Sequence, residues 1–227
     1  MAEPRILVID DEEAIRRFLR VALSSQGYKV VEANSGQVGL SSAVSEKPEV
    51  IILDLGLPDI DGVEVTRLLR KWTKIPIVIL SVRGSENDKI AALDAGADDY
   101  VTKPFGVGEL LARLRVALRR AKNNPDQPVY EYMGLKVDLV RRKVMVSDKE
   151  ISLTPTEYEL LHTLTVNAGK VMTHRQLLRE VWGTEYGNEF HMVHVNISNL
   201  RRKIETDPTR PQFIVTEPGV GYRLKSE

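Results

Sequence analysis

The chain has 227 residues, carries 32 basic and 32 acidic side chains, and contains no cysteine. Its length allows one or two domains, the lack of cysteine excludes disulfides and thiolate metal sites, and no run is long and apolar enough to span a membrane. Because the charges also balance on either side of Lys122, nucleic-acid binding must rest on local basic clusters. With no signal-peptide pattern at the N-terminus, these features predict a cytoplasmic protein with no membrane partner.

The first half of the chain alternates short apolar runs with amphipathic stretches. After the first apolar run, Ile15, Phe18, Leu19 and Ala22 recur at helical spacing, and Gly27 is placed to end that helix. The same rhythm predicts strands at residues 6–9, 29–33, 50–53, 77–80 and 100–102, and helices near residues 36–45, 62–72, 85–95 and 106–121. Five strands alternating with five helices predict a doubly wound α/β fold, with the strands of a parallel sheet ordered 2-1-3-4-5.

A polar stretch with two prolines and no periodicity, residues 122–128, separates two predicted domains, residues 1–121 and 129–227. The second domain opens with β-like pieces at 137–139, 143–146 and 150–153. Helices follow at 155–167, 174–182 and near 189–205, and Thr154, Pro155 and Glu157 form a capping box at the start of the first. Apolar runs at 213–216 and 222–225 predict a β-hairpin. This order of elements is typical of a winged helix-turn-helix.

Polar side chains directly follow four predicted strands of the first domain. They are Asp10 with Asp11, Asp54, Ser81 and Lys103. Because parallel strands end at one edge of the sheet, we expect these side chains to converge there. Crowded carboxylates favour a hard divalent cation, Asp54 can attack a phosphoryl group, and Lys103 and Ser81 can stabilise its oxygens. Each residue alone has an ordinary structural explanation, such as helix capping, so the prediction rests on the set.

The motifs around these residues resemble a known family. Asp54 is followed by Leu57-Pro58 and Asp61-Gly62, and Lys103 is followed by Pro104-Phe105. These motifs resemble the receiver domain of bacterial response regulators, and the chain outside the linker resembles their OmpR/PhoB subfamily. Residues 52–59 and 88–100 are similar, more narrowly, to members that regulate a potassium-transport operon; most other relatives carry Met where Gly56 stands. The resemblance implies a flavodoxin-like (CheY-like) receiver joined to a C-terminal winged-helix domain.

The resemblance also implies how the receiver works. Asp54 would accept a phosphoryl group from a sensor histidine kinase, and Lys103, preceding a cis peptide bond, would contact that group. Ser81 and Tyr100 would form a switch pair, in which Ser81 moves toward the phosphoryl group and Tyr100 turns inward. Mg²⁺, or Mn²⁺ in its place, would be held by Asp11, Asp54, the backbone carbonyl of Gly56 and, through water, Asp10.

A further implication of the resemblance is a homodimer that forms on activation. The two-fold interface would use the fourth helix, fifth strand and fifth helix, with each ion pair formed twice. The pairs would be Lys89–Glu109, Asp94–Arg115 and Asp99–Arg113. Without the resemblance, these charges are typical of a solvated face.

The second domain carries local basic clusters that predict contact with promoter DNA. Amide side chains can read bases in the major groove, and basic side chains bind phosphate. Taken alone, the basic run 201–203 also fits a helix end that complements the helix dipole. Pro218 stands where many relatives have a wing-tip arginine, and Ser198 and Asn199 replace common arginines, so base preferences do not transfer. The residues expected at the DNA are His194, Asn196, Ser198, Asn199, Arg201, Arg202, Lys203, Tyr222 and Arg223.

Together these features predict a phosphorylation-dependent transcriptional regulator that is no enzyme beyond its own phosphorylation and dephosphorylation. Its expected partners are a sensor kinase, promoter DNA and RNA polymerase, and its expected target is a potassium-transport operon. Another regulon of the subfamily and a constitutive DNA binder are the alternatives. An aspartyl-phosphate hydrolase is disfavoured because Gly56 stands where such enzymes have a second Asp. A flavin or nucleotide module is disfavoured because the acidic run 10–13 would repel phosphate.

Overall fold

The computed structural model describes residues 3–82, 85–122, 129–186 and 188–226. The chain divides into two compact units, residues 1–123 and 124–227. Apart from Lys122, which ends a helix, the predicted linker lies outside the described residues. Within the described part of the chain, no helix combines the length and apolarity needed to cross a membrane.

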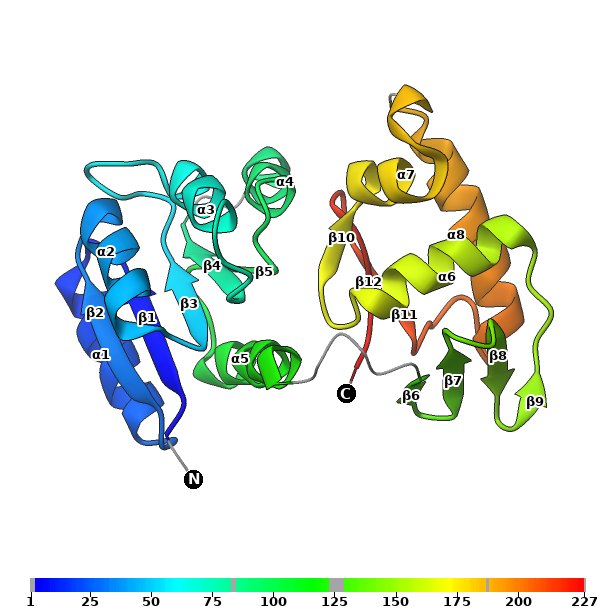
Figure 1. The fold of residues 1–227 in the computed structure, drawn as a ribbon, viewed down its shortest axis with the longest axis horizontal. Helices are drawn as coiled ribbons and strands as arrows, with labels where there is room; N and C mark the ends of the chain where they lie inside the picture. Colours follow the sequence, from blue (N-terminus) through cyan, green and yellow to red (C-terminus); the bar gives the residue numbers. More distant parts are fainter. Residues whose placement is uncertain (1–2, 83–84, 123–128, 187, 227) are drawn as a thin grey trace. The chain divides into compact units, whose positions relative to one another are not determined.

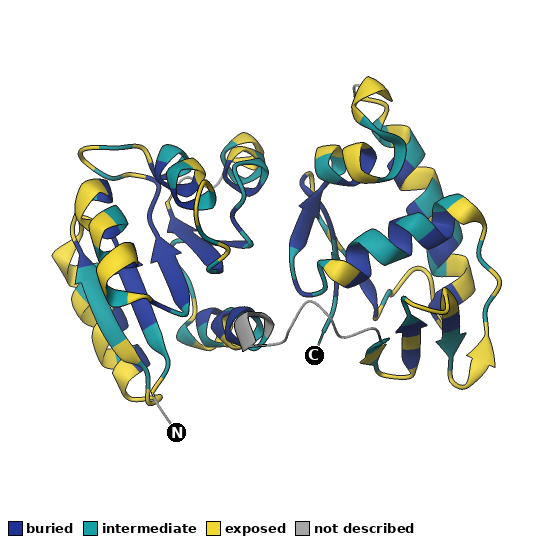
Figure 2. Cartoon of the chain, viewed as in Figure 1, coloured by how far each residue is buried: buried dark blue, intermediate teal, exposed yellow. Residues whose placement is uncertain are grey.

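The N-terminal unit is a parallel sheet with helices on both faces (Figure 1). The strand order β2-β1-β3-β4-β5 confirms the predicted topology. The inner strands are almost completely buried (Figure 2), because a sheet covered on both sides needs continuous apolar runs rather than alternation. The strands are β1 (Arg5–Ile9), β2 (Lys29–Ala33), β3 (Val50–Leu53), β4 (Ile77–Ser81) and β5 (Asp99–Thr102).

The helices of this unit form the outer layers. On one face, Leu19 and Leu23 of α1 and Leu114 of α5 pack against the sheet core. On the other face α2 lies very close to β1, because a Cβ at Gly39 would come within 2.5 Å of the Ile9 side chain. The first helix ends at Ser24, before the predicted stop at Gly27, which has φ +79° in the following turn. The helices are α1 (Glu13–Ser24), α2 (Gly36–Glu46), α3 (Gly62–Arg70), α4 (Glu86–Asp94) and α5 (Val107–Lys122).

Within its described residues, the C-terminal unit combines two antiparallel sheets and three α-helices around one hydrophobic core. The capping box of Thr154 and Glu157 is present at the first helix, and Thr173 and Gln176 form a second one at the next helix. The strands follow the orders β6-β7-β8-β9 and β10-β12-β11. The elements are β6 (Val129–Tyr132), β7 (Leu135–Asp138), β8 (Lys143–Val146), β9 (Lys149–Glu150), α6 (Pro155–Val166), β10 (Val171–Thr173), α7 (His174–Trp182), a 3-10 turn (Thr184–Tyr186), α8 (Phe190–Ile204), β11 (Ile214–Glu217) and β12 (Gly221–Leu224).

Three details of this unit differ from the sequence analysis. The strand expected at 150–153 covers only residues 149–150, and β6 and β10 were not predicted. Both missed strands are short and exist through pairing, β6 with β7 and β10 with the C-terminal hairpin. The hairpin and the long helix, by contrast, were predicted, because their apolar residues face the core at regular spacing.

Candidate functional site

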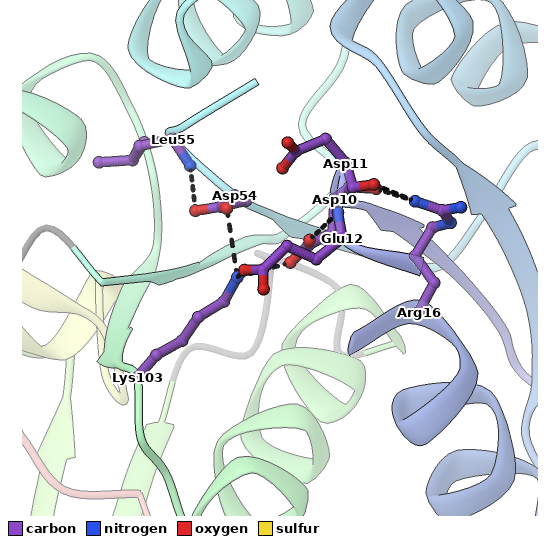
Figure 3. A network of polar contacts seen from close by, with 7 residues as sticks. All are labelled: Asp10, Asp11, Glu12, Arg16, Asp54, Leu55 and Lys103. Atoms are coloured by element: carbon purple, nitrogen blue, oxygen red, sulfur yellow. Dashed lines mark hydrogen bonds and ion pairs between the residues drawn. The ribbon is translucent and has the colours of Figure 1, made fainter. Parts of the chain in front are cut away.

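The side chains of Asp10, Asp54 and Lys103 meet at the carboxyl edge of the parallel sheet (Figure 3). The ammonium of Lys103 lies 2.8 Å from Asp10 Oδ2, 3.2 Å from Asp54 Oδ2 and 3.1 Å from Glu12 Oε1. The Asp10 side chain is 2% exposed and those of Asp54 and Lys103 are 6% exposed. One lysine therefore joins carboxylates from the loops after β1 and β3.

Burial and charge set the protonation of this cluster. Burial raises the pKa of Asp10, and the hydrogen bond from Lys103 only partly opposes that effect. Burial by itself would lower the pKa of Lys103. The hydrogen bond to Asp10 and the negative charges of Asp10 and Asp54 outweigh burial, so the pKa of Lys103 lies above its usual value. The lysine therefore stays cationic, and its single charge faces more than one carboxylate.

Backbone groups fix the orientation of the two buried carboxylates. Asp54 Oδ1 accepts a hydrogen bond from Leu55 N at 2.7 Å, which leaves Oδ2 directed at the lysine. Asp10 Oδ1 likewise accepts from Glu12 N at 2.9 Å, while its Oδ2 takes the lysine hydrogen bond. The Lys103–Pro104 peptide bond is cis, as predicted.

A group of acidic oxygens at this edge is suited to a cation. Among the described residues, one oxygen from each of Asp10, Glu12 and Asp54 lies within 4.8 Å of the others. Hard divalent cations prefer such oxygen donors, so the donor set fits a metal of this class. Asp11, a predicted ligand, is exposed, and no dashed line joins its carboxylate to the lysine in Figure 3. Glu12, which was not predicted as a ligand, joins the group because it is two residues from Asp10 in a turning loop.

The remaining predicted receiver residues lie on or beside the same strands. Gly56 is exposed, and a Cβ there would meet only Asp54 Oδ2, at 3.7 Å. Ser81 is fully buried at the end of β4, and Tyr100 is 8% exposed in β5. These strands are paired so that Tyr100 lies beside Ile79, two residues before Ser81. The structure therefore places the predicted switch pair on adjacent strands, with the tyrosine ring buried.

The predicted dimer-face charges form contacts within the chain. Arg113 donates to both oxygens of Asp99 at 2.9 Å and also binds Glu109 at 2.9 Å. The Lys89 ammonium lies 5.9 Å from the centre of the Tyr100 ring. Three of the residues predicted to pair between subunits, Asp99, Glu109 and Arg113, are therefore joined within one chain.

The predicted DNA-contact residues of α8 differ in what they contact. His194, Ser198 and Arg202 are exposed along the helix. Asn196 and Asn199 are half-buried, and the Asn196 amide donates to Met192 O at 2.8 Å. Arg202 donates to Asn199 Oδ1 at 3.4 Å, which leaves most of the guanidinium facing solvent.

Other residues predicted to contact DNA make hydrogen bonds or ring contacts within the unit. Arg201 donates to Ile214 O at 2.6 Å and lies 5.5 Å from the centre of the largely buried Tyr222 ring. Lys203 donates to Glu157 Oε2 at 2.6 Å, which ties the end of α8 to the cap of α6. Arg223 binds Glu217 across the hairpin at 2.9 Å. The three adjacent basic residues therefore differ in their contacts: Arg202 faces solvent, whereas Arg201 and Lys203 bind groups within the unit. Only the tertiary structure shows this difference.

Fold and site together define a receiver-type unit, with a lysine-bridged acidic edge, followed by a unit of winged-helix order. Residues 6–115 match the response regulator receiver domain, and residues 148–224 match the transcriptional regulatory protein C-terminal domain. The chain belongs to the two-component response regulators of the OmpR/PhoB type and is a phosphorylation-dependent transcriptional regulator.

Particular relatives narrow the match. The chain is 53% identical to the KDP operon transcriptional regulatory protein KdpE of Escherichia coli, over 96% of this chain and 98% of that protein. It is 48% identical to the transcriptional regulatory protein KdpE of Mycobacterium tuberculosis, over 97% and 99% of the two chains. Among solved structures it resembles DrrB, an OmpR/PhoB homologue of Thermotoga maritima, with a TM-score of 0.52, 34% identity, and coverage of 98% and 99%.

Proposed function

We propose that this chain controls a potassium-transport operon in response to phosphorylation of Asp54 by a sensor histidine kinase. The observation that supports the target most strongly is the 53% identity to a KDP operon regulator over nearly the whole of both chains. The buried, backbone-oriented Asp54 carboxylate supports the acceptor role. Another regulon of the same subfamily is the alternative target.

In the proposed reaction, an Asp54 oxygen attacks the phosphorus of a phosphohistidine. The bond from phosphorus to the histidine nitrogen breaks, and an acyl phosphate forms on Asp54. The Lys103 ammonium then contacts a phosphoryl oxygen in place of the Asp54 carboxylate oxygen that it binds in this structure. When bound, Mg²⁺ or Mn²⁺ would supply positive charge against that of the phosphoryl oxygens. Asp10, Glu12 and Asp54 are the carboxylates that would hold it, with Asp11 and the Gly56 carbonyl as the donors that the resemblance adds.

Phosphorylation would then act on the DNA-binding unit through dimerisation. We propose that Ser81 and Tyr100 carry the change to the α4–β5–α5 face. Arg113 would exchange its own Asp99 for that of the second copy, with Lys89–Glu109 and Asp94–Arg115 as the other pairs. Pairs that include exposed side chains, such as Glu109 and Arg115, would set register more than affinity. Two linked winged-helix units bind adjacent half-sites more tightly by effective concentration, and the bound dimer would then recruit RNA polymerase.

The target is tested by a reporter experiment. In bacteria lacking their own regulator of the potassium-transport operon, we expect this chain to restore expression of an operon–reporter fusion at low potassium. A phosphate-starvation promoter serves as the control for another regulon. Restored expression of the control promoter alone would refute the potassium assignment and favour the alternative.

A second prediction separates DNA contact from structural support within the basic run of α8. We expect Arg202→Ala to weaken binding to all DNA sequences and to reduce the slope of log affinity against log salt by about 1, because one phosphate contact is lost. We expect Lys203→Ala to lower the free energy of unfolding by about 1 kcal/mol, a value discounted for partial exposure, because buried Glu157 loses its partner.

DNA-binding titrations at several salt concentrations measure the salt slope of both variants, and urea unfolding measures their stability. Equal salt slopes in Arg202→Ala and wild type would show that Arg202 does not contact phosphate. An unchanged unfolding curve in Lys203→Ala would remove the structural role assigned to that lysine.

A further inference from the structure

Arg16, on α1, contacts the backbone of the acidic loop rather than its carboxylates (Figure 3). Its Nη1 donates to Asp10 O at 2.7 Å and to Asp11 O at 2.8 Å. The Arg16 side chain is only 14% exposed, and its Nε lies 3.7 Å from the carboxylate of Glu32 on β2. A single guanidinium nitrogen therefore joins two consecutive carbonyls next to the phosphoryl-acceptor cluster.

Two consecutive carbonyls do not normally face the same atom. In an extended strand successive residues alternate in direction, so both carbonyls can reach one nitrogen only if the chain turns between them. The chain does bend at Asp11, two residues after the end of β1. At this bend, the Asp10 carboxylate faces Lys103, while the Asp11 side chain lies on the side of the loop away from the Arg16 guanidinium (Figure 3).

The acidic partner of Arg16 is Glu32, at 3.7 Å. Glu32 also binds Arg20 at 2.8 Å, so one carboxylate of β2 anchors two arginines of α1. Because Arg16 already has an acidic partner, its effect on the cluster comes more from its rigid hydrogen-bond donors than from its net charge. Arg20 shares the same anchor, is half exposed, and makes its hydrogen bond to Glu32.

We infer that Arg16 is a positioning residue for the divalent cation of the receiver: it holds the loop in the bend that presents the carboxylates of Asp10 and Asp11. This inference rests on the proposed function, because it assumes that the acidic edge holds a cation during phosphorylation of Asp54. Groups that orient metal ligands in this way commonly contribute 10-fold to 100-fold in metal affinity.

The experiment compares full-length wild type, Arg16→Ala, Arg16→Lys and Arg20→Ala. The Mg²⁺ dependence of phosphorylation by acetyl phosphate gives a half-saturating Mg²⁺ concentration and a maximal rate for each chain. We expect Arg16→Ala to raise the half-saturating concentration about 10-fold while the maximal rate at saturating Mg²⁺ changes much less. Arg16→Lys should recover part of the loss, because a lysine can reach one carbonyl but lacks the planar fork. Arg20→Ala should behave as wild type.

A thermal melt of each chain identifies any variant that does not fold, and Arg16→Lys then carries the comparison. If the Arg16 variants have the same half-saturating Mg²⁺ concentration as Arg20→Ala, the positioning role is wrong. A fall in maximal rate with no change in Mg²⁺ dependence would also overturn it. Asp54→Ala is measured in parallel: if that chain is still phosphorylated, it is the proposed function that fails, independently of Arg16.

Discussion

We expect Asp54→Ala to show the same size and the same DNA affinity with and without acetyl phosphate and Mg²⁺. In wild type the same treatment should produce a dimer and raise DNA affinity by about 100-fold, because linking two binding units makes the second contact intramolecular. The alanine removes the buried carboxylate that Leu55 N and Lys103 orient at the sheet edge. Size-exclusion chromatography with light scattering and DNA-binding titrations measure the two effects.

Asp61→Ala provides a matched control for this experiment. Asp61 lies in the same loop, is exposed, and caps α3 by accepting from Val63 N at 2.9 Å. Its loss should cost about 1 kcal/mol of stability and leave the response to acetyl phosphate intact. If Asp54→Ala still dimerises on treatment, Asp54 is not the switch, and the chain is a constitutive DNA binder or is phosphorylated elsewhere.

The second large effect is expected on removal of the lysine. Lys103→Met should lower the free energy of unfolding by about 3 kcal/mol in metal-free buffer, because it leaves the buried carboxylates of Asp10 and Asp54 without their cation. Protonation of Asp10, whose pKa burial already raises, limits the loss. Added Mg²⁺ should reduce the difference in unfolding free energy between Lys103→Met and wild type, because a divalent cation can then balance the charge of the same carboxylates.

Urea unfolding with and without Mg²⁺ measures this effect, and Lys74→Met, at an exposed lysine, is the control. The control should unfold like wild type in both buffers. A Lys103→Met chain whose deficit is unchanged by Mg²⁺ would argue against a cation at the acidic edge. If Lys103→Met unfolds like wild type in metal-free buffer, the lysine does not stabilise the buried carboxylates of Asp10 and Asp54.

Much of the receiver follows from local sequence pattern. The inner strands are recognisable because a sheet covered on both faces requires continuous apolar runs. The sequence predicts that Asp10, Asp54 and Lys103 lie close together, because each directly follows a strand and parallel strands end at one edge of the sheet. The start of α6 was equally readable, because a capping box is formed by residues close together in the chain.

Local sequence pattern does not predict the contacts of a charged side chain that has several possible partners within reach. Asp11 and Glu12 are adjacent acids, and no local pattern indicates that it is the Glu12 carboxylate that lies 3.1 Å from the lysine. The pairing of Arg113 with Asp99 of its own chain was likewise not predicted, because sequence spacing does not distinguish contacts within a chain from contacts between copies.

The sequence by itself determined the order of the longer elements, the topology of the parallel sheet and the presence of Asp10, Asp54 and Lys103 at its edge, since these depend on periodicity and on position at strand ends. The tertiary structure alone decided the short strands β6 and β10, which exist through their pairing partners. It also decided that Lys203 supports buried Glu157 while Arg202 faces solvent. The physical reason is that the partner and burial of a long charged side chain depend on residues distant in the chain, which no local pattern encodes.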